Sequence, residues 1–178
     1  MAAISLMMEL FDSGSHFVCT EDLYGGSVRI FEALEKKRGF SFSYVNTADV
    51  EAVEKAITDQ TKALYIETPS NPTMQVTDLA EMSRLATKHG LLLIVDNTFA
   101  TPINCRPFEW GADIVTHSTT KYMDGHAMTV GGCIVDSGNF DWEAHHDKFT
   151  GLTEPDESYH GIIYTQKFGK LAYITKAT

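Results

Sequence analysis

Six short apolar runs, separated by longer segments with helical spacing, most strongly limit the folds open to this 178-residue chain. The runs are rich in valine, isoleucine and phenylalanine, and they cover residues 16–20, 40–45, 63–68, 91–96, 113–117 and 132–136. Runs that are apolar on both faces are typical of strands in a mostly parallel sheet, whose strands are joined by helical crossovers. The alternation therefore predicts an α/β fold with helices on both faces of the sheet.

Apolar residues recur at helical spacing in three of the connecting segments, residues 27–37, 50–57 and 78–89. The first is followed by Gly39, a residue type that commonly comes just after a helix end. The third begins with Asp78 and Glu81 at the spacing of a capping box and ends before Gly90. These signals predict three helices between strands.

The sequence changes character after about residue 138. Residues 139–164 are polar, aromatic and turn-rich without a clear period, which indicates a long functional loop or a connection between domains. We expect residues 1–138 to form the central part of a large domain, and residues 139–178 to form a loop and helical segment that leads toward a further C-terminal domain. The chain starts with a helical pattern and stops inside another, so both ends resemble cuts through a larger fold.

Charge and cysteine content argue against several classes of protein. Fourteen basic and twenty-four acidic side chains give a formal charge of −10, without the basic face that nucleic-acid binding needs. Cys19, Cys105 and Cys133 are distant and form no CxxC pair, which favours a reducing, cytoplasmic setting over a disulfide framework. The histidines, His117 among them, show no convincing metal-ligand spacing. No apolar run approaches the roughly 20 residues of a membrane helix, so no membrane partner is expected.

Asp96 and Lys121 indicate a specific chemistry. Asp96 ends an apolar run, and Lys121 follows a short run of hydroxyl residues that begins with Ser118. A lysine able to form an imine, a carboxylate able to hold a pyridinium nitrogen and hydroxyls able to hold a phosphate are the parts of a pyridoxal phosphate (PLP) site. In open α/β sheets, ligands bind beyond the carboxyl ends of the strands, where these residues fall. Taken singly, Asp96 could equally cap the next helix, and Lys121 could lie in a solvated loop.

Four more residues could contact such a ligand, and each has a simpler alternative. Tyr24, before two glycines at a helix start, could lie flat on a heteroaromatic ring or serve as a packing anchor. Asn71 could hydrogen-bond a ring oxygen or form an Asx-turn. The hydroxyls of Ser118 and Thr120 could both face one phosphate or satisfy the local backbone.

Five motifs in order resemble those of the Cys/Met-metabolism family of PLP enzymes; they span residues 1–4, 24–26, 67–72, 96–102 and 118–122. The resemblance implies the large domain of the aspartate-aminotransferase-like, fold type I enzymes, with residues 1–138 in its cofactor-binding part. Members of the family are more than twice as long as this chain. Three further segments look most like O-acetylhomoserine sulfhydrylases, namely residues 105–113, 135–142 and 151–161.

The resemblance also implies roles for two catalytic residues and one partner of the ring. Lys121 would be the Schiff-base lysine, and Tyr24 would stack on the cofactor ring and assist proton transfer. Asp96 would be the partner of the pyridine nitrogen.

The remaining implied contacts lie around the rim of the cofactor. Asn71 would meet the 3-hydroxyl oxygen, and Thr98 would lie near the ring. Ser118 and Thr120 would hold the phosphate, together with a backbone amide at Met1 at the start of a helix. Asp124, Ala127 and Met128 replace the more usual glycine-rich stretch after the lysine, which predicts a different access path.

The activity implied is PLP-dependent γ-replacement on O-acetylhomoserine, with sulfide or a thiol as acceptor and homocysteine or methionine as product. One alternative is a γ-lyase acting on methionine or cystathionine. Another is a noncatalytic fragment that retains the cofactor-binding fold. The implied partners are the amino-acid substrate, sulfide or a thiol, and further copies of the chain in a homo-oligomer, which is a dimer of dimers in the full-length family.

Overall fold

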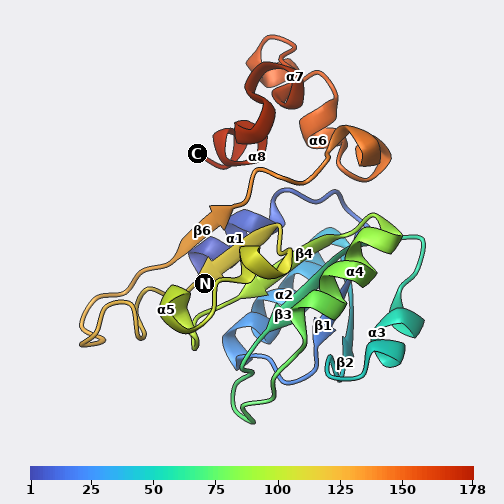
Figure 1. Ribbon diagram of the computed structural model, residues 1–178. Helices are drawn as coiled ribbons and strands as arrows, with labels where there is room; N and C mark the ends of the chain where they lie inside the picture. The colour runs from blue at the N-terminus through green and yellow to red at the C-terminus, as the bar shows by residue number, and fades with distance from the viewer.

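A six-stranded sheet forms the centre of the computed structural model, which describes residues 1–178 (Figure 1). Its strands are β1 (His16–Thr20), β2 (Ser41–Val45), β3 (Thr61–Glu67), β4 (Leu92–Asp96), β5 (Ile114–His117) and β6 (Cys133–Asp136), in the order β2-β1-β3-β4-β5-β6. Neighbouring strands are parallel, except for the antiparallel pair of β5 and β6. Each strand overlaps one of the predicted runs, and the predicted mostly parallel α/β fold is confirmed.

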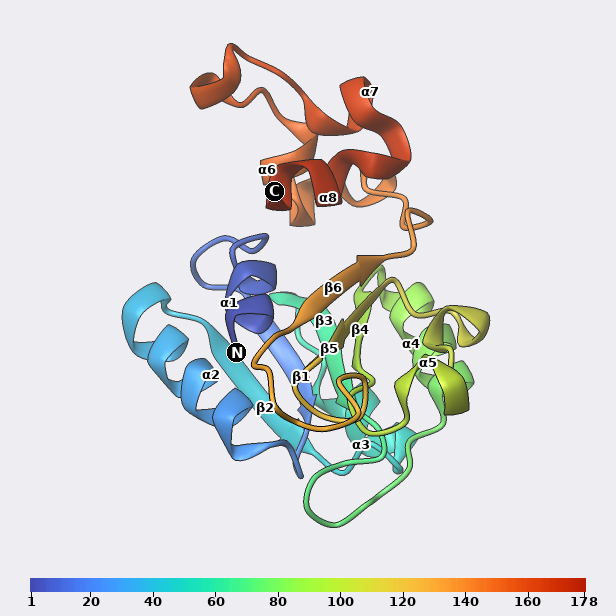
Figure 2. The same ribbon diagram turned by 90° about the vertical axis from the view of Figure 1, so that its left-hand side faces the viewer.

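Helices cover both faces of the sheet, as predicted (Figures 1 and 2). The longer ones are α1 (Ala2–Met8), α2 (Gly25–Arg38), α3 (Val50–Ala56) and α4 (Leu79–His89). The predicted ends of α2 and α4 are confirmed, because Gly39 and Gly90 adopt left-handed backbone conformations just after them. The carboxylate of Asp78 accepts a hydrogen bond from the Glu81 backbone N–H at the start of α4.

Alternate residues of each central strand enter two separate hydrophobic cores. In β4, Leu92 and Ile94 pack with α1 and α2, whereas Leu93 and Val95 pack with α3 and α4. All four side chains are fully buried. A strand that is covered on both faces needs apolar residues at consecutive positions, which explains the uninterrupted apolar run.

Residues 139–178 form short helices rather than one long loop. They are η2 (Glu143–Lys148), α6 (Thr150–Thr153), η3 (Glu157–Tyr159), α7 (Tyr164–Phe168), η4 (Gly169–Leu171) and α8 (Ala172–Ala177). Trp142, Phe149 and Tyr173 are buried in the same core as α1, and the rings of Phe149 and Phe11 lie 6.3 Å apart. Contacts between scattered aromatic rings give this region its core, so its sequence shows no regular apolar period.

Two small helices, α5 (Thr101–Asn104) and η1 (Pro107–Trp110), connect β4 to β5. None of the helices is both long enough and apolar enough to cross a membrane.

Candidate active site

One large pocket, of about 1210 Å³, opens where β3, β4 and β5 end. All of the residues predicted to bind the cofactor line it, namely Met1, Tyr24, Asn71, Asp96, Thr98, Ser118, Thr120 and Lys121. Met1 and Tyr24 immediately precede α1 and α2, Asp96 ends β4, and the others lie in the loops after β3, β4 and β5. The carboxyl ends of parallel strands therefore gather these residues at one edge of the sheet, as expected for an open α/β fold.

Asp96 lies at the floor of the pocket and is 8% exposed. Its Oδ1 accepts hydrogen bonds from the backbone N–H of Thr98, at 3.1 Å, and from the Thr98 hydroxyl, at 2.5 Å. Its Oδ2 receives only the Tyr65 hydroxyl, at 3.4 Å. Burial raises the pKa of Asp96, and the Thr98 hydrogen bonds oppose that rise. A buried carboxylate that has no ion-pair partner and a weakly occupied oxygen fits a protonated ring nitrogen.

The helix-capping alternative for Asp96 is not observed, because Ala100 is the residue that precedes the first turn of α5. Thr98 instead connects the ends of two strands. Its hydroxyl donates to Asp96 and accepts a 2.8 Å hydrogen bond from the backbone N–H of Ser118. Thr98 thus fixes the position of the carboxylate relative to the residues that follow β5.

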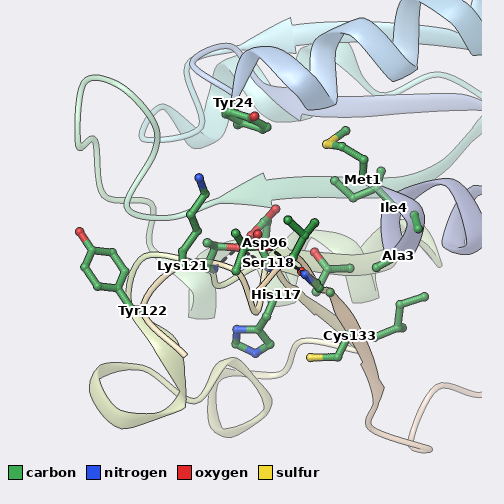
Figure 3. A pocket seen from close by; sticks show the side chains of 18 of the residues that line it. Met1, Ala3, Ile4, Tyr24, Asp96, His117, Ser118, Lys121, Tyr122 and Cys133 are labelled. Carbon is green, nitrogen blue, oxygen red and sulfur yellow. Dashed lines mark hydrogen bonds between the residues drawn. The ribbon is translucent and has the colours of Figure 1, made fainter. Parts of the chain in front are cut away.

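Tyr24 immediately precedes α2, and its ring borders the pocket (Figure 3). Its backbone N–H donates to Glu67 Oε2 at 2.9 Å. A β-carbon at Gly26 would lie 2.4 Å from Cε1 of the Tyr24 ring and 3.0 Å from the Met1 sulfur. The absent side chain at Gly26 therefore leaves room for the ring. Because Tyr24 is 45% exposed, it is available to a ligand and is not a buried packing anchor.

Lys121 lies in the turn after β5, where its backbone N–H donates to the Ser118 carbonyl at 3.2 Å. Its side chain is exposed, as the solvated-loop alternative expects. Even so, it lines the pocket together with Asp96 and Tyr24, and its amine points toward Tyr24 (Figure 3). None of the ion pairs in the protein includes Lys121. The amine is thus placed to react with a ligand in the pocket.

The hydroxyls predicted to hold a phosphate differ from one another. Thr120 Oγ1 donates to the Gly131 carbonyl at 3.2 Å and accepts from the Gly131 N–H at 3.0 Å, so it satisfies the backbone in this structure. The Ser118 hydroxyl makes no hydrogen bond within the protein, and neither does the Asn71 amide group. The Asx-turn alternative for Asn71 is therefore not observed, and both groups are free for a ligand.

The segment that replaces the glycine-rich stretch forms a closed loop. Asp124 accepts hydrogen bonds from the Met128 N–H, at 2.8 Å, and from the Thr129 hydroxyl, at 2.5 Å. These bonds lower the pKa of Asp124. Ala127 has a φ of 53°, a left-handed conformation that glycine adopts more easily.

Glu67 and His117 were not predicted as site residues, yet both line the pocket. Glu67 is 5% exposed, and burial raises its pKa to about 8. His117 is also 5% exposed; burial lowers its pKa, the nearby Asp96 opposes this, and its Nδ1 has no hydrogen-bond partner. Each ends a strand, as Asp96 does, so the strand-end rule that identified Asp96 could have identified them. No cluster of three His, Cys, Asp or Glu side chains is arranged to hold a metal ion.

Comparison with known proteins identifies the family. Residues 1–165 match the family model described as Cys/Met metabolism PLP-dependent enzyme. The chain belongs to this family. The homocysteine/cysteine synthase of Saccharomyces cerevisiae is 44% identical over 166 residues, which are 93% of this chain and 37% of the yeast protein. Cystathionine gamma-lyase of Bacillus subtilis is 52% identical over 135 residues, which are 76% of this chain and 36% of that enzyme.

A solved structure shows the same fold. Cystathionine gamma-lyase from Lactobacillus plantarum, complexed with L-serine, matches with a TM-score of 0.75 and 40% sequence identity. The match covers 97% of this chain and 43% of the Lactobacillus chain. This chain therefore spans less than half of the length of these relatives.

Proposed function

We propose that this chain provides the cofactor site of an enzyme that carries out γ-replacement on O-acetylhomoserine with sulfide or a thiol. The observation that carries the proposal is a single pocket that combines the buried carboxylate of Asp96, the amine of Lys121 and the accessible ring of Tyr24. When bound, PLP supplies a conjugated ring that takes up electrons as bonds of the amino-acid substrate break.

Three side chains would do the central work. Asp96, whose Oδ2 has only one long hydrogen bond, would hold the protonated ring nitrogen. Lys121 Nζ would hold the cofactor covalently, and as a free amine it would move protons at the substrate's α and β carbons. Tyr24 stacks its ring on the cofactor and assists that proton transfer.

Polar groups of the pocket that lack a hydrogen-bond partner would contact the 3-hydroxyl oxygen and the phosphate of the cofactor. We assign the Asn71 amide to the 3-hydroxyl oxygen and the Ser118 hydroxyl, with the backbone at Met1, to the phosphate. Thr98 lies near the ring and orients Asp96. Thr120 joins the phosphate contacts by exchanging its hydrogen bonds with Gly131 for ligand oxygens.

The similarity to the yeast synthase favours replacement over elimination, since it extends over 93% of this chain, against 76% for the Bacillus lyase. The higher identity of the lyase match, 52%, favours the second candidate, a γ-lyase on methionine or cystathionine. The chain alone could also bind the cofactor without turnover, because it covers only about a third of the relatives' length.

An activity assay on the protein incubated with PLP separates these functions. Replacement predicts homocysteine from O-acetylhomoserine plus sulfide, and no product from methionine or cystathionine alone. Release of 2-oxobutanoate from methionine or cystathionine would establish the lyase instead. Cofactor binding with no product from any substrate would identify a noncatalytic fragment. Lys121→Ala, which lacks the reactive amine, is the control for each reaction.

We further propose that the protein acts in the cytoplasm as a homo-oligomer. All three cysteines are unpaired, as suits a reducing compartment. Ile103, Met128 and Val130 are 89%, 84% and 95% exposed, and Met128 and Val130 belong to the loop beside the pocket. Contact with a second copy would cover these apolar side chains. Light scattering at increasing protein concentration tests this, and a monomer at every concentration would contradict it.

A further inference from the structure

Glu67 is a buried acid that the mechanism above does not use. It ends β3, and its Cα is paired in the sheet register with that of Asp96, the last residue of β4. Its backbone N–H donates to the Thr20 hydroxyl at 3.2 Å, so the strand holds its main chain in place. Its side chain lines the pocket and reaches the turn that carries Tyr24.

The contact with Tyr24 connects two separate parts of the site. Glu67 Oε2 accepts the Tyr24 backbone N–H at 2.9 Å, and no other side chain bonds the Tyr24 backbone. On its other side, the Tyr24 carbonyl accepts hydrogen bonds from Ser27 and Val28 in the first turn of α2. Glu67 therefore fixes the start of α2, and with it the Tyr24 ring, relative to the strand that pairs with Asp96.

The surroundings of Glu67 favour its neutral form. Asp96 from β4 and Asp22 from the loop after β1 face it with like charge, and no lysine, arginine or histidine forms an ion pair with it. Glu67 receives the backbone N–H groups of Tyr24 and Asn71. Asp96 receives two hydrogen bonds from Thr98, one from the Tyr65 hydroxyl and the favourable influence of His117. Of two neighbouring buried acids, the one with more donors keeps the negative charge. That acid is Asp96.

We propose that Glu67 is a positioning residue that fixes the Tyr24 turn over the pocket as an uncharged carboxylic acid. By staying neutral, it leaves Asp96 as the single negative charge at the pocket floor. The inference rests on the proposed PLP site for its functional consequence, but the link between Glu67 and Tyr24 is a property of the protein alone.

Two substitutions separate the hydrogen bond from the charge. Glu67→Gln keeps an uncharged acceptor of the same shape, whereas Glu67→Met fills similar volume without an acceptor. The control is Asp49→Ala, which removes a carboxylate that caps α3 and lies outside the pocket. The measurements are PLP affinity, by absorbance titration of the full chain at neutral pH, and hydrogen exchange at the Tyr24 amide without cofactor.

We expect Glu67→Gln and Asp49→Ala to bind PLP within about twofold of the unsubstituted protein, and Glu67→Met to bind about tenfold more weakly. Exchange at the Tyr24 amide should accelerate only in Glu67→Met. Equal losses of PLP affinity in Glu67→Gln and Glu67→Met would show that the negative charge is needed. Unchanged exchange at the Tyr24 amide in Glu67→Met would show that Glu67 does not hold Tyr24. Either result overturns the proposal. If the unsubstituted protein does not bind PLP, the proposed function fails, and the exchange measurement still decides the role of Glu67. If Glu67→Met does not fold, the PLP affinity of Glu67→Gln still tests whether the negative charge of Glu67 is needed.

Discussion

The floor of the pocket and the loop that carries Lys121 are built in different ways. Glu67 and Asp96, on the floor, are 5% and 8% exposed and lie at the paired ends of two central strands. Lys121 belongs to a loop in which Met128 is 84% exposed and Val130 is 95% exposed. The loop is held mainly by local hydrogen bonds of Thr120 with Gly131 and of Asp124 with Met128 and Thr129.

This difference indicates how the two halves of the site are maintained. The sheet places the acidic half before any ligand binds, because its strands are fixed by backbone hydrogen bonds and two cores. The amine half has few buried contacts, and its exposed loop depends on local hydrogen bonds. Changes on the floor should therefore alter both stability and cofactor affinity, whereas changes in the loop should have small effects on stability.

Asp96→Ala should have the largest effect on cofactor binding. Removal of the only charged partner of the ring nitrogen in a buried site should weaken PLP affinity by about 100-fold or more. Absorbance titration measures this loss. Asp113→Ala is the matched control, because Asp113 is a partly buried carboxylate that bonds the Leu93 N–H at the opposite ends of the strands. Equal losses of affinity in the two variants would show that the floor acts only through stability.

Glu67→Gln should remove a pH dependence of stability that originates on the floor. Burial raises the pKa of Glu67 from 4.5 to about 8, so the folded state binds the proton more tightly than the unfolded state does. The stabilisation is complete below pH 4.5 and is lost as pH rises to about 8, by at most about 1.4 kcal/mol per pH unit. Denaturant unfolding from pH 5 to 8.5 should show a flatter profile for the variant; identical profiles would contradict the assignment.

Gly26→Ala tests whether cofactor binding depends on the position of the Tyr24 ring. The added methyl group would lie 2.4 Å from the ring and should displace it, weakening PLP affinity about tenfold. Gly25→Ala is the control, because a β-carbon there meets nothing within 4 Å. If both variants bind PLP equally well, the position of Tyr24 does not matter for the cofactor.

Ala127→Gly, in the loop, should have the smallest effect. Glycine relieves the left-handed conformation at a φ of 53°, and its greater freedom in the unfolded state partly offsets the gain. We expect the free energy of unfolding to rise by about 0.5 kcal/mol, with PLP affinity unchanged. A loss of stability would mean that the Ala127 side chain makes contacts that outweigh its backbone strain.

Much of the fold could be predicted because the burial of the central strands leaves a direct record in the sequence. Leu92 to Val95 are apolar at consecutive positions since both faces of β4 are covered. The same logic placed Asp96 at a strand end, where ligands bind. The core of residues 139–178 could not be predicted in this way. Its rings, such as Trp142 and Phe149, pack together although they are not regularly spaced in the sequence.

The finer geometry of the site depends on contacts between distant residues, which no local pattern reveals. Glu67 meets Tyr24 across 43 positions of sequence, and the role of Gly26 depends on where the Tyr24 ring lies. Thr120 was predicted to face a phosphate, yet its hydroxyl bonds Gly131 after the chain reverses direction. Residue types identified the chemistry, but the partners of each side chain required the tertiary structure.

Chemical trapping tests the central claim that the buried floor and the exposed lysine form one cofactor site. The full chain would be mixed with PLP, reduced with borohydride, digested and mapped by mass spectrometry. The account predicts one pyridoxyl adduct, on Lys121, which disappears in Lys121→Ala while the other lysines stay unmodified. A folded protein without an adduct on Lys121, or a single adduct that persists in Lys121→Ala, would contradict it.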